Sequence, residues 1–103
     1  MSDFVFVRVA SVNDVPEGEG RVVSVNGTPV ALFNVGGEFH AISNVCAHKG
    51  GPLGEGELDG SVVTCPWHGW QYDVTTGRNI MMPSIAVKKF PVKVEGEDVL
   101  VDV

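Results

Sequence analysis

The sequence has few basic residues and no long hydrophobic run. Its 103 residues include 7 Lys and Arg against 13 Asp and Glu, which gives a formal net charge of −6. Nucleic-acid-binding domains are more often basic, so a nucleic-acid partner is disfavoured. No apolar stretch approaches the ~20 residues that span a bilayer, and no secretory signal is visible. We therefore expect a cytoplasmic protein with neither a nucleic-acid nor a membrane partner.

Cysteine is also scarce. The chain holds only Cys46 and Cys65. In a cytosolic chain, metal binding or redox chemistry is a better default for two cysteines than a disulfide. The length fits one compact domain, residues 1–103, with little room for a second.

Short runs rich in Val and Phe, separated by glycine turns, predict an all-β domain. The expected strands are residues 4–10, 21–25, 29–35, 38–43, 61–65, 70–74, 87–95 and 98–103. Asn26-Gly27 and Gly36-Gly37 are hairpin signals, so the strands around them should form a meander. Pro91 indicates an edge strand or a bulge. Residues 44–60 show no clear periodicity and indicate a structured loop region.

Each cysteine has a histidine close behind it. Cys46-Ala47-His48 is followed, after sixteen residues, by Cys65-Pro66-Trp67-His68. Thiolate suits iron–sulfur clusters and zinc, and imidazole suits zinc, copper and iron. Zinc sites commonly pair like ligands, whereas here each pair is mixed. Mixed pairs on two loops allow one iron to take both cysteines and the other both histidines, which is the ligand set of a Rieske centre. A single structural zinc is the alternative.

The segments CAHKGG and CPWHGWQYD resemble the two cluster-binding boxes of Rieske proteins. The resemblance implies a Rieske-like antiparallel β-sandwich with a small cluster-binding subdomain, residues 44–84. It implies one [2Fe–2S] cluster per chain, held by Cys46, His48, Cys65 and His68. The family's membrane-bound members bridge the two loops with a disulfide. Here Gly51 and Trp67 stand at those positions.

Further residues of the two boxes, and a third loop, are expected around the cluster. Backbone N–H groups approach sulfur most easily at glycine, which favours Gly50, Gly51 and Gly69 as donors. Tyr72 matches the family's tyrosine donor, while Trp70 stands where high-potential members have a serine donor. With one side-chain donor missing, the reduction potential should lie low in the Rieske range of about −150 to +300 mV. Pro83 resembles the proline of the covering loop.

The resemblance implies an electron carrier rather than an enzyme. Ring-hydroxylating oxygenases follow their Rieske domain with a catalytic domain that binds mononuclear iron, and all but one of the three histidines here are expected cluster ligands. We expect a ferredoxin that passes one electron from a flavin-containing reductase to a terminal oxygenase. Docking is expected near His48 and His68, on a rim of Lys49, Pro66, Trp67 and Pro83. The alternative is a small Rieske subunit of a reductase such as assimilatory nitrite reductase.

Overall fold

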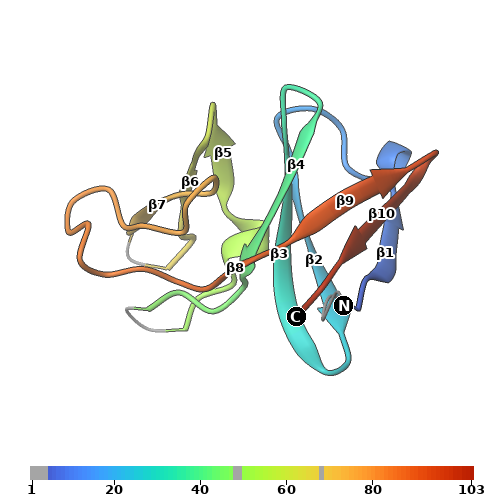
Figure 1. Cartoon of the computed structure of the whole chain (residues 1–103). Coiled ribbons are helices and arrows are strands. Elements are labelled where there is room, and N and C mark those ends of the chain that lie inside the picture. The colour runs from blue at the N-terminus through green and yellow to red at the C-terminus, as the bar shows by residue number, and fades with distance from the viewer. Residues whose placement is uncertain (1–4, 48–49, 68) are drawn as a thin grey trace.

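Three antiparallel sheets make up the described part of the chain, which covers residues 5–47, 50–67 and 69–103 of this computed structural model (Figure 1). One sheet has the order β1 (Val7–Ser11), β10 (Asp98–Val101), β9 (Val92–Glu95). The central sheet has the order β2 (Gly20–Val25), β3 (Thr28–Val35), β4 (Glu38–Ser43), β8 (Lys89–Phe90). The third has the order β5 (Glu57–Asp59), β6 (Val62–Thr64), β7 (Gln71–Asp73). The all-β fold expected from the sequence is confirmed. Within the described residues, no helix is long and apolar enough to cross a membrane.

The central sheet contains the predicted meander. β2 (Gly20–Val25), β3 (Thr28–Val35) and β4 (Glu38–Ser43) pair in sequence, and the short β8 (Lys89–Phe90) joins the outer edge of β4. Asn26 and Gly27 have φ angles of 50° and 85°, and Gly36 and Gly37 have 59° and 93°. Two successive positive φ angles are the requirement of the type I′ hairpin turn, so both turn predictions are confirmed.

β3 lies between two hydrophobic cores because both of its faces are buried. Successive side chains of a strand point to opposite faces of the sheet. Val30 and Leu32 therefore pack into the core shared with the β1-β10-β9 sheet, while Ala31 and Phe33 pack into the core shared with Cys46 and Cys65. The near-continuous apolar run of β3 is thus the physical link between the sandwich and the two cysteines.

The strand predicted over residues 87–95 is two strands in two sheets. β8 pairs with β4, whereas β9 (Val92–Glu95) pairs with β10 (Asp98–Val101). Pro91 stands between them, where its missing N–H and fixed φ interrupt a ladder. The predicted irregularity at Pro91 is therefore a crossing from the central sheet to the sheet that β10 shares with β1 (Val7–Ser11).

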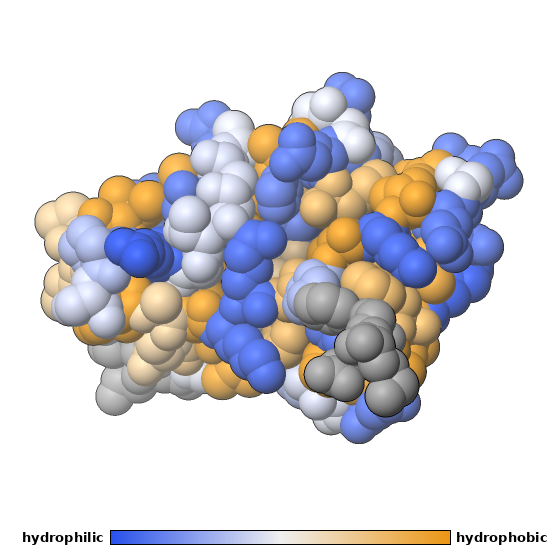
Figure 2. Space-filling view, viewed as in Figure 1, coloured by the Kyte–Doolittle hydropathy of each residue, from blue (hydrophilic) through white to orange (hydrophobic). Residues whose placement is uncertain are grey.

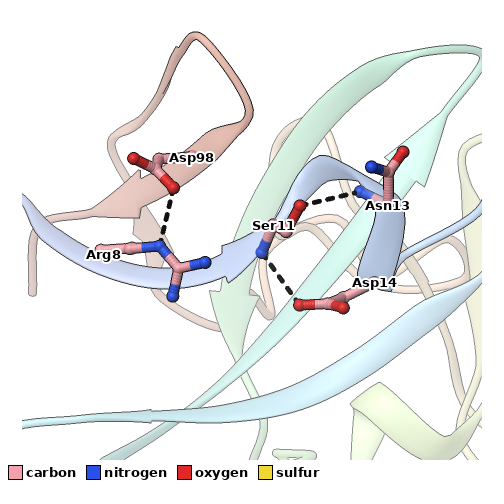
Figure 3. Close-up of polar contacts among 5 residues, drawn as sticks. All are labelled: Arg8, Ser11, Asn13, Asp14 and Asp98. Carbon is pink, nitrogen blue, oxygen red and sulfur yellow. Dashed lines mark hydrogen bonds and ion pairs between the residues drawn. The ribbon is translucent and has the colours of Figure 1, made fainter.

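A short 3-10 helix, η1 (Val12–Asp14), turns the chain out of β1 (Figure 3). Ser11 and Asp14 form a capping box: the Ser11 hydroxyl accepts from the Asn13 N–H, and the Asp14 carboxylate accepts from the Ser11 N–H at 2.9 Å. Beside it, the Arg8 Nε donates to the Asp98 carboxylate at 2.7 Å across the β1–β10 pair. These polar contacts stabilise the β1-β10-β9 sheet, and their residues are far in sequence from both cysteines.

The third sheet lies within residues 44–84 and beside the sandwich (Figure 1). It consists of β5 (Glu57–Asp59), β6 (Val62–Thr64) and β7 (Gln71–Asp73), preceded by a second 3-10 helix, η2 (Leu53–Glu55). The sequence prediction treated residues 44–60 as loop and missed β5 and η2. Each has only three residues, too few to show a periodicity, and β5 is held by its pairing with β6.

Candidate metal centre

The two cysteines begin loops that close in the same way. The Cys46 N–H donates to the Gly51 carbonyl at 3.0 Å, and the Cys65 N–H donates to the Trp70 carbonyl at 2.7 Å. In both loops the residue four positions after the cysteine is a glycine with a φ of 75°, Gly50 or Gly69. An L-residue in that conformation costs roughly 1–2 kcal/mol, so each box glycine permits the tight return of its loop.

The remaining predicted ligands, His48 and His68, and the rim residue Lys49 lie outside the described residues. Cys46 and Cys65 are described, and both are 2 % exposed within one core. The two are not joined by a disulfide in the described chain. Among the described residues alone, no group of three or more Cys, His, Asp or Glu side chains gathers at a common point.

The two loops pack directly against each other through Gly51. A Cβ at Gly51 would lie 2.7 Å from the Cys65 Sγ and 3.0 Å from the Trp67 Cγ. Both distances are shorter than an ordinary van der Waals contact, so only glycine fits without movement. Gly51 and Trp67, which stand where the resemblance puts the bridging cysteines of membrane-bound Rieske proteins, are therefore neighbours across the loop interface.

The environment of Cys65 opposes a charged thiolate. Burial is the main cause that raises the pKa of Cys65, and the neighbouring Cys46 thiol raises it further. The Trp67 backbone N–H donates toward the Cys65 sulfur and acts in the opposite direction. Two buried, neighbouring thiols need a nearby cation before both can ionise, because desolvation and the repulsion of like charges each disfavour the thiolate.

Tyr72 places a hydroxyl group against the first cysteine. It is fully buried on β7, with its hydroxyl 3.4 Å from the Cys46 Sγ, and the Ala47 N–H donates to the same hydroxyl at 3.2 Å. Burial, together with the Cys46 thiol, raises the pKa of Tyr72 to about 12. The hydroxyl therefore keeps its proton at neutral pH, in contact with the first cysteine of the pair.

The loop after β7 forms part of the exposed apolar surface of this end of the molecule (Figure 2). The Met81 and Met82 side chains are 82 % and 41 % exposed, Trp67 is 50 % exposed, and Pro83 is also exposed. A pocket of about 170 Å³ lies here, lined by Gly69, Trp70, Gln71, Asn79, Met81 and Met82. This loop thus meets the second cysteine loop at Gly69 and Trp70.

Sequence reasoning missed Asn79, a buried residue beside this pocket. Its Oδ1 accepts hydrogen bonds from the backbone N–H groups of Met81 and Met82, at 2.9 and 3.0 Å. An Asn that bonds the backbone two and three residues ahead is an Asx turn, and Asn ahead of an irregular, proline-bearing stretch is its sequence signal. The signal was present in the run Asn79-Ile80-Met81-Met82-Pro83, but it does not reveal that the side chain is buried.

The described residues fit an iron–sulfur group. The site offers two buried sulfurs, a tyrosine hydroxyl in contact with one of them, a backbone N–H that donates toward the other, and a glycine whose missing Cβ leaves room beside Cys65. Thiolate pairs prefer soft metal centres, and hydrogen-bond donors around sulfur are the usual means by which proteins tune such centres. The third histidine, His40, belongs to β4, and its Nε2 lies 3.0 Å from the Glu38 carboxylate.

Comparison with known proteins gives the same result along nearly the whole chain. Residues 5–91 match the model of the Rieske [2Fe-2S] domain. The biphenyl dioxygenase ferredoxin subunit of Pseudomonas sp. (strain KKS102) is 43 % identical over 99 residues, which are 94 % of this chain and 91 % of that protein.

Two solved structures have the same fold. A chain in the complex of reduced oxygenase and oxidized ferredoxin in carbazole 1,9a-dioxygenase is 33 % identical, with a TM-score of 0.87 over 97 % of this chain and 94 % of that one. A protein of Mycobacterium tuberculosis, proposed to be the small subunit of an NADH-dependent nitrite reductase, has a TM-score of 0.90 at 23 % identity, over 99 % and 97 %. At that identity the second likeness concerns the fold alone.

Proposed function

This chain belongs to the family of Rieske [2Fe–2S] domains, and we propose that it carries single electrons from a flavin-containing ferredoxin reductase to a terminal oxygenase. The observation that carries the proposal is the end-to-end match to a dioxygenase ferredoxin subunit, 94 % of this chain against 91 % of that protein. The family's cofactor is one [2Fe–2S] cluster, which when bound takes up and releases one electron at a time.

Cys46, His48, Cys65 and His68 are the proposed ligands, with the two thiolates on one iron and the two imidazoles on the other. Support for the cysteine half comes from the two buried sulfurs at the starts of equivalent loops. The histidine half rests on the sequence pattern, because His48 and His68 lie outside the described residues. Residues 44–84, which contain the third sheet, are the proposed cluster-binding subdomain of a single domain, residues 1–103.

The chain's own groups around the sulfurs set the electrostatics. The Trp67 N–H donates toward the Cys65 sulfur, and the Tyr72 hydroxyl contacts the Cys46 sulfur. Donors to sulfur stabilise added negative charge and so raise a potential. With Trp70 in place of a serine donor, the proposed potential stays in the lower part of the Rieske range of about −150 to +300 mV.

Docking of both redox partners is proposed near His48 and His68. The exposed side chains of Trp67, in the second cysteine loop, and of Met81, Met82 and Pro83, in the loop after β7, offer apolar contacts to a partner. Electron-transfer interfaces are small, typically below about 1,200 Å² in total, so binding should be weak and exchange fast. A cytoplasmic location is part of the proposal, and two cysteines without a mutual disulfide fit a reducing compartment.

The alternative role, a fixed small subunit of a nitrite reductase, has no specific support. The nitrite-reductase likeness is at 23 % identity and extends only to the fold, whereas the dioxygenase ferredoxin match is at 43 %. A stable stoichiometric complex on purification would favour the fixed subunit, and a monodisperse free protein would favour the ferredoxin.

Electron transfer by the purified holoprotein tests the proposed function. The chain should be reduced by a flavoprotein reductase with NADH, show the electron paramagnetic resonance signal of a reduced Rieske cluster, and be reoxidised by a terminal Rieske oxygenase. Replacing any one of Cys46, Cys65, His48 or His68 by Ala should abolish the signal, whereas the control His40→Ala should retain it. A colourless protein with zinc and no inorganic sulfide would overturn the proposal.

A further inference from the structure

Asn79 is a buried polar side chain at the junction of the third loop and the cysteines. It is 3 % exposed, and its backbone forms an isolated antiparallel bridge with Tyr72. Its Oδ1 is used by the N–H groups of Met81 and Met82. The side chain therefore has its two amide N–H groups left for other acceptors, and a buried amide left without one is costly.

The acceptor next to that amide is the Tyr72 hydroxyl. The antiparallel bridge sets the Asn79 side chain beside the Tyr72 side chain. Burial and Cys46 raise the pKa of Tyr72, and the Asn79 amide, as a hydrogen-bond donor to the phenolic oxygen, acts in the opposite direction. The Ala47 N–H donates to the same oxygen from the first cysteine loop, at 3.2 Å. Two N–H groups from different loops thus converge on one phenolic oxygen.

The direction of the contact between Tyr72 and Cys46 follows from this arrangement. A phenolic hydroxyl has one proton to donate and lone pairs on its oxygen that accept. The oxygen receives Ala47 and Asn79 as donors, and the sulfur of Cys46 lies 3.4 Å away as an acceptor. The arrangement that satisfies every group has the hydroxyl proton on the Cys46 sulfur. Without Asn79, the hydroxyl loses one of the two donors that hold it in that orientation.

We propose that Asn79 is a positioning residue for electron transfer, which holds the Tyr72 hydroxyl proton on the Cys46 sulfur and thereby raises the reduction potential of the centre. The proposal rests on the proposed role of Cys46 as a cluster ligand. Because one planar amide holds the backbone of Met81 and Met82 through its oxygen and the Tyr72 hydroxyl through its nitrogen, the position of the exposed loop and the donor to sulfur are fixed together.

A double-mutant cycle on the cluster-loaded protein tests this role. The variants are Asn79→Leu, Tyr72→Phe and the two combined, and the readouts are the midpoint potential and the Fe–S stretching frequencies by resonance Raman. Tyr72→Phe should lower the equilibrium constant for reduction about tenfold, which is about 59 mV for one electron. Asn79→Leu should lower it about fivefold, or about 41 mV on the same scale. In the Tyr72→Phe background, Asn79→Leu should change it less than about 1.5-fold, because coupled residues are not additive.

Asn34→Leu is the matched control. Asn34 is also buried, at 6 % exposed, and also makes two hydrogen bonds, to the Val15 carbonyl and from the Gly37 N–H. Its loss should lower thermal stability without shifting the potential or the Fe–S frequencies. If Asn34→Leu shifts the potential as much as Asn79→Leu does, then the loss of any buried Asn side chain and its hydrogen bonds disturbs the centre, and the proposal is overturned.

A second variant keeps the test decisive if Asn79→Leu does not load its cluster. Asn79→Asp retains an oxygen acceptor for Met81 and Met82 but presents an acceptor instead of a donor to Tyr72, so the hydroxyl should turn from the sulfur to the carboxylate. The added carboxylate also shifts the potential through its charge. This effect is the same in the unaltered and the Tyr72→Phe backgrounds, so comparing the two removes it. An equal shift in both backgrounds refutes the positioning role. Absence of a Rieske signal from the unaltered protein refutes the proposed function instead.

Discussion

The most direct test of how the two cysteine loops fit together is Gly51→Ala. A Cβ at this position would lie 2.7 Å from the Cys65 Sγ and 3.0 Å from the Trp67 Cγ. To reach an ordinary contact distance of about 3.5 Å, the loops must separate by about 0.8 Å at the sulfur. Overpacking of this kind costs about 1–3 kcal/mol. For a domain of this size, about 2 kcal/mol corresponds to a fall in Tm of roughly 8–16 °C.

The cost at Gly51 should depend on the cluster. A cysteine sulfur that binds no metal can rotate about χ1 and relieve the contact, whereas a sulfur held by iron cannot. We therefore expect Gly51→Ala to lower the melting temperature of the holoprotein by more than it lowers that of the apoprotein. The holoprotein melt is measured by the loss of visible absorption at a fixed scan rate, and the apoprotein melt by circular dichroism. Equal shifts in both forms would contradict the assignment of Cys65 as a ligand.

Gly50 provides the matched control in the same loop. It has a φ of 75° and open surroundings, with the Val45 Cγ1 at 3.7 Å as the nearest atom to an added Cβ. Gly50→Ala should cost roughly 1–2 kcal/mol through backbone strain alone. Asn tolerates the left-handed conformation, so Gly50→Asn should recover part of that loss. Gly51→Asn should recover nothing, and a holoprotein with Gly51→Ala that melts like the unaltered protein would refute the steric reasoning.

Three further predictions concern the scaffold. Phe33→Ala should destabilise the protein by about 3–5 kcal/mol in urea denaturation, because Phe33 is fully buried in the core shared with the cysteines; a loss below about 1 kcal/mol would show that the site collapses around the cavity. Ser11→Ala should cost about 0.5–1 kcal/mol through the lost cap, with an unchanged reduction potential, and a shifted potential would contradict the separation of the outer sheet from the centre. Arg8→Gln should leave the Tm unchanged, since its ion pair with Asp98 is exposed; a clear drop would show that the pair is structural.

Local signals predicted the parts of the fold that depend on neighbouring residues. Asn26-Gly27 and Gly36-Gly37 specify their turns through backbone conformations that few other residue pairs adopt, so the meander followed from the sequence alone. The cysteines of the two boxes, nineteen positions apart, lie in one core, which is compatible with the ligand set expected from the mixed spacing. The prediction failed at β5 and at the two strands around Pro91. In both places the strand forms, or changes sheet, because of the distant strand with which it pairs. Glu57–Asp59 is a strand because β6 lies beside it.

The polar groups of Ala47, Tyr72 and Asn79 beside Cys46 are also brought together by strand pairing. For this reason, sequence motifs identify the expected ligands but not the groups around them. Ala47, Tyr72 and Asn79 come from three segments, and each has an ordinary local interpretation as a loop residue, a strand aromatic and an Asx turn. Their convergence is produced by the β7 strand and by the Tyr72–Asn79 bridge, which bring the third loop back along β7. A tyrosine alone is a donor of unspecified direction, and it becomes a directed donor to sulfur only when its oxygen is already occupied. The direction of the Tyr72 hydroxyl proton, through which we propose that the reduction potential is raised, therefore depends on the arrangement of all three residues and cannot be found in any single motif.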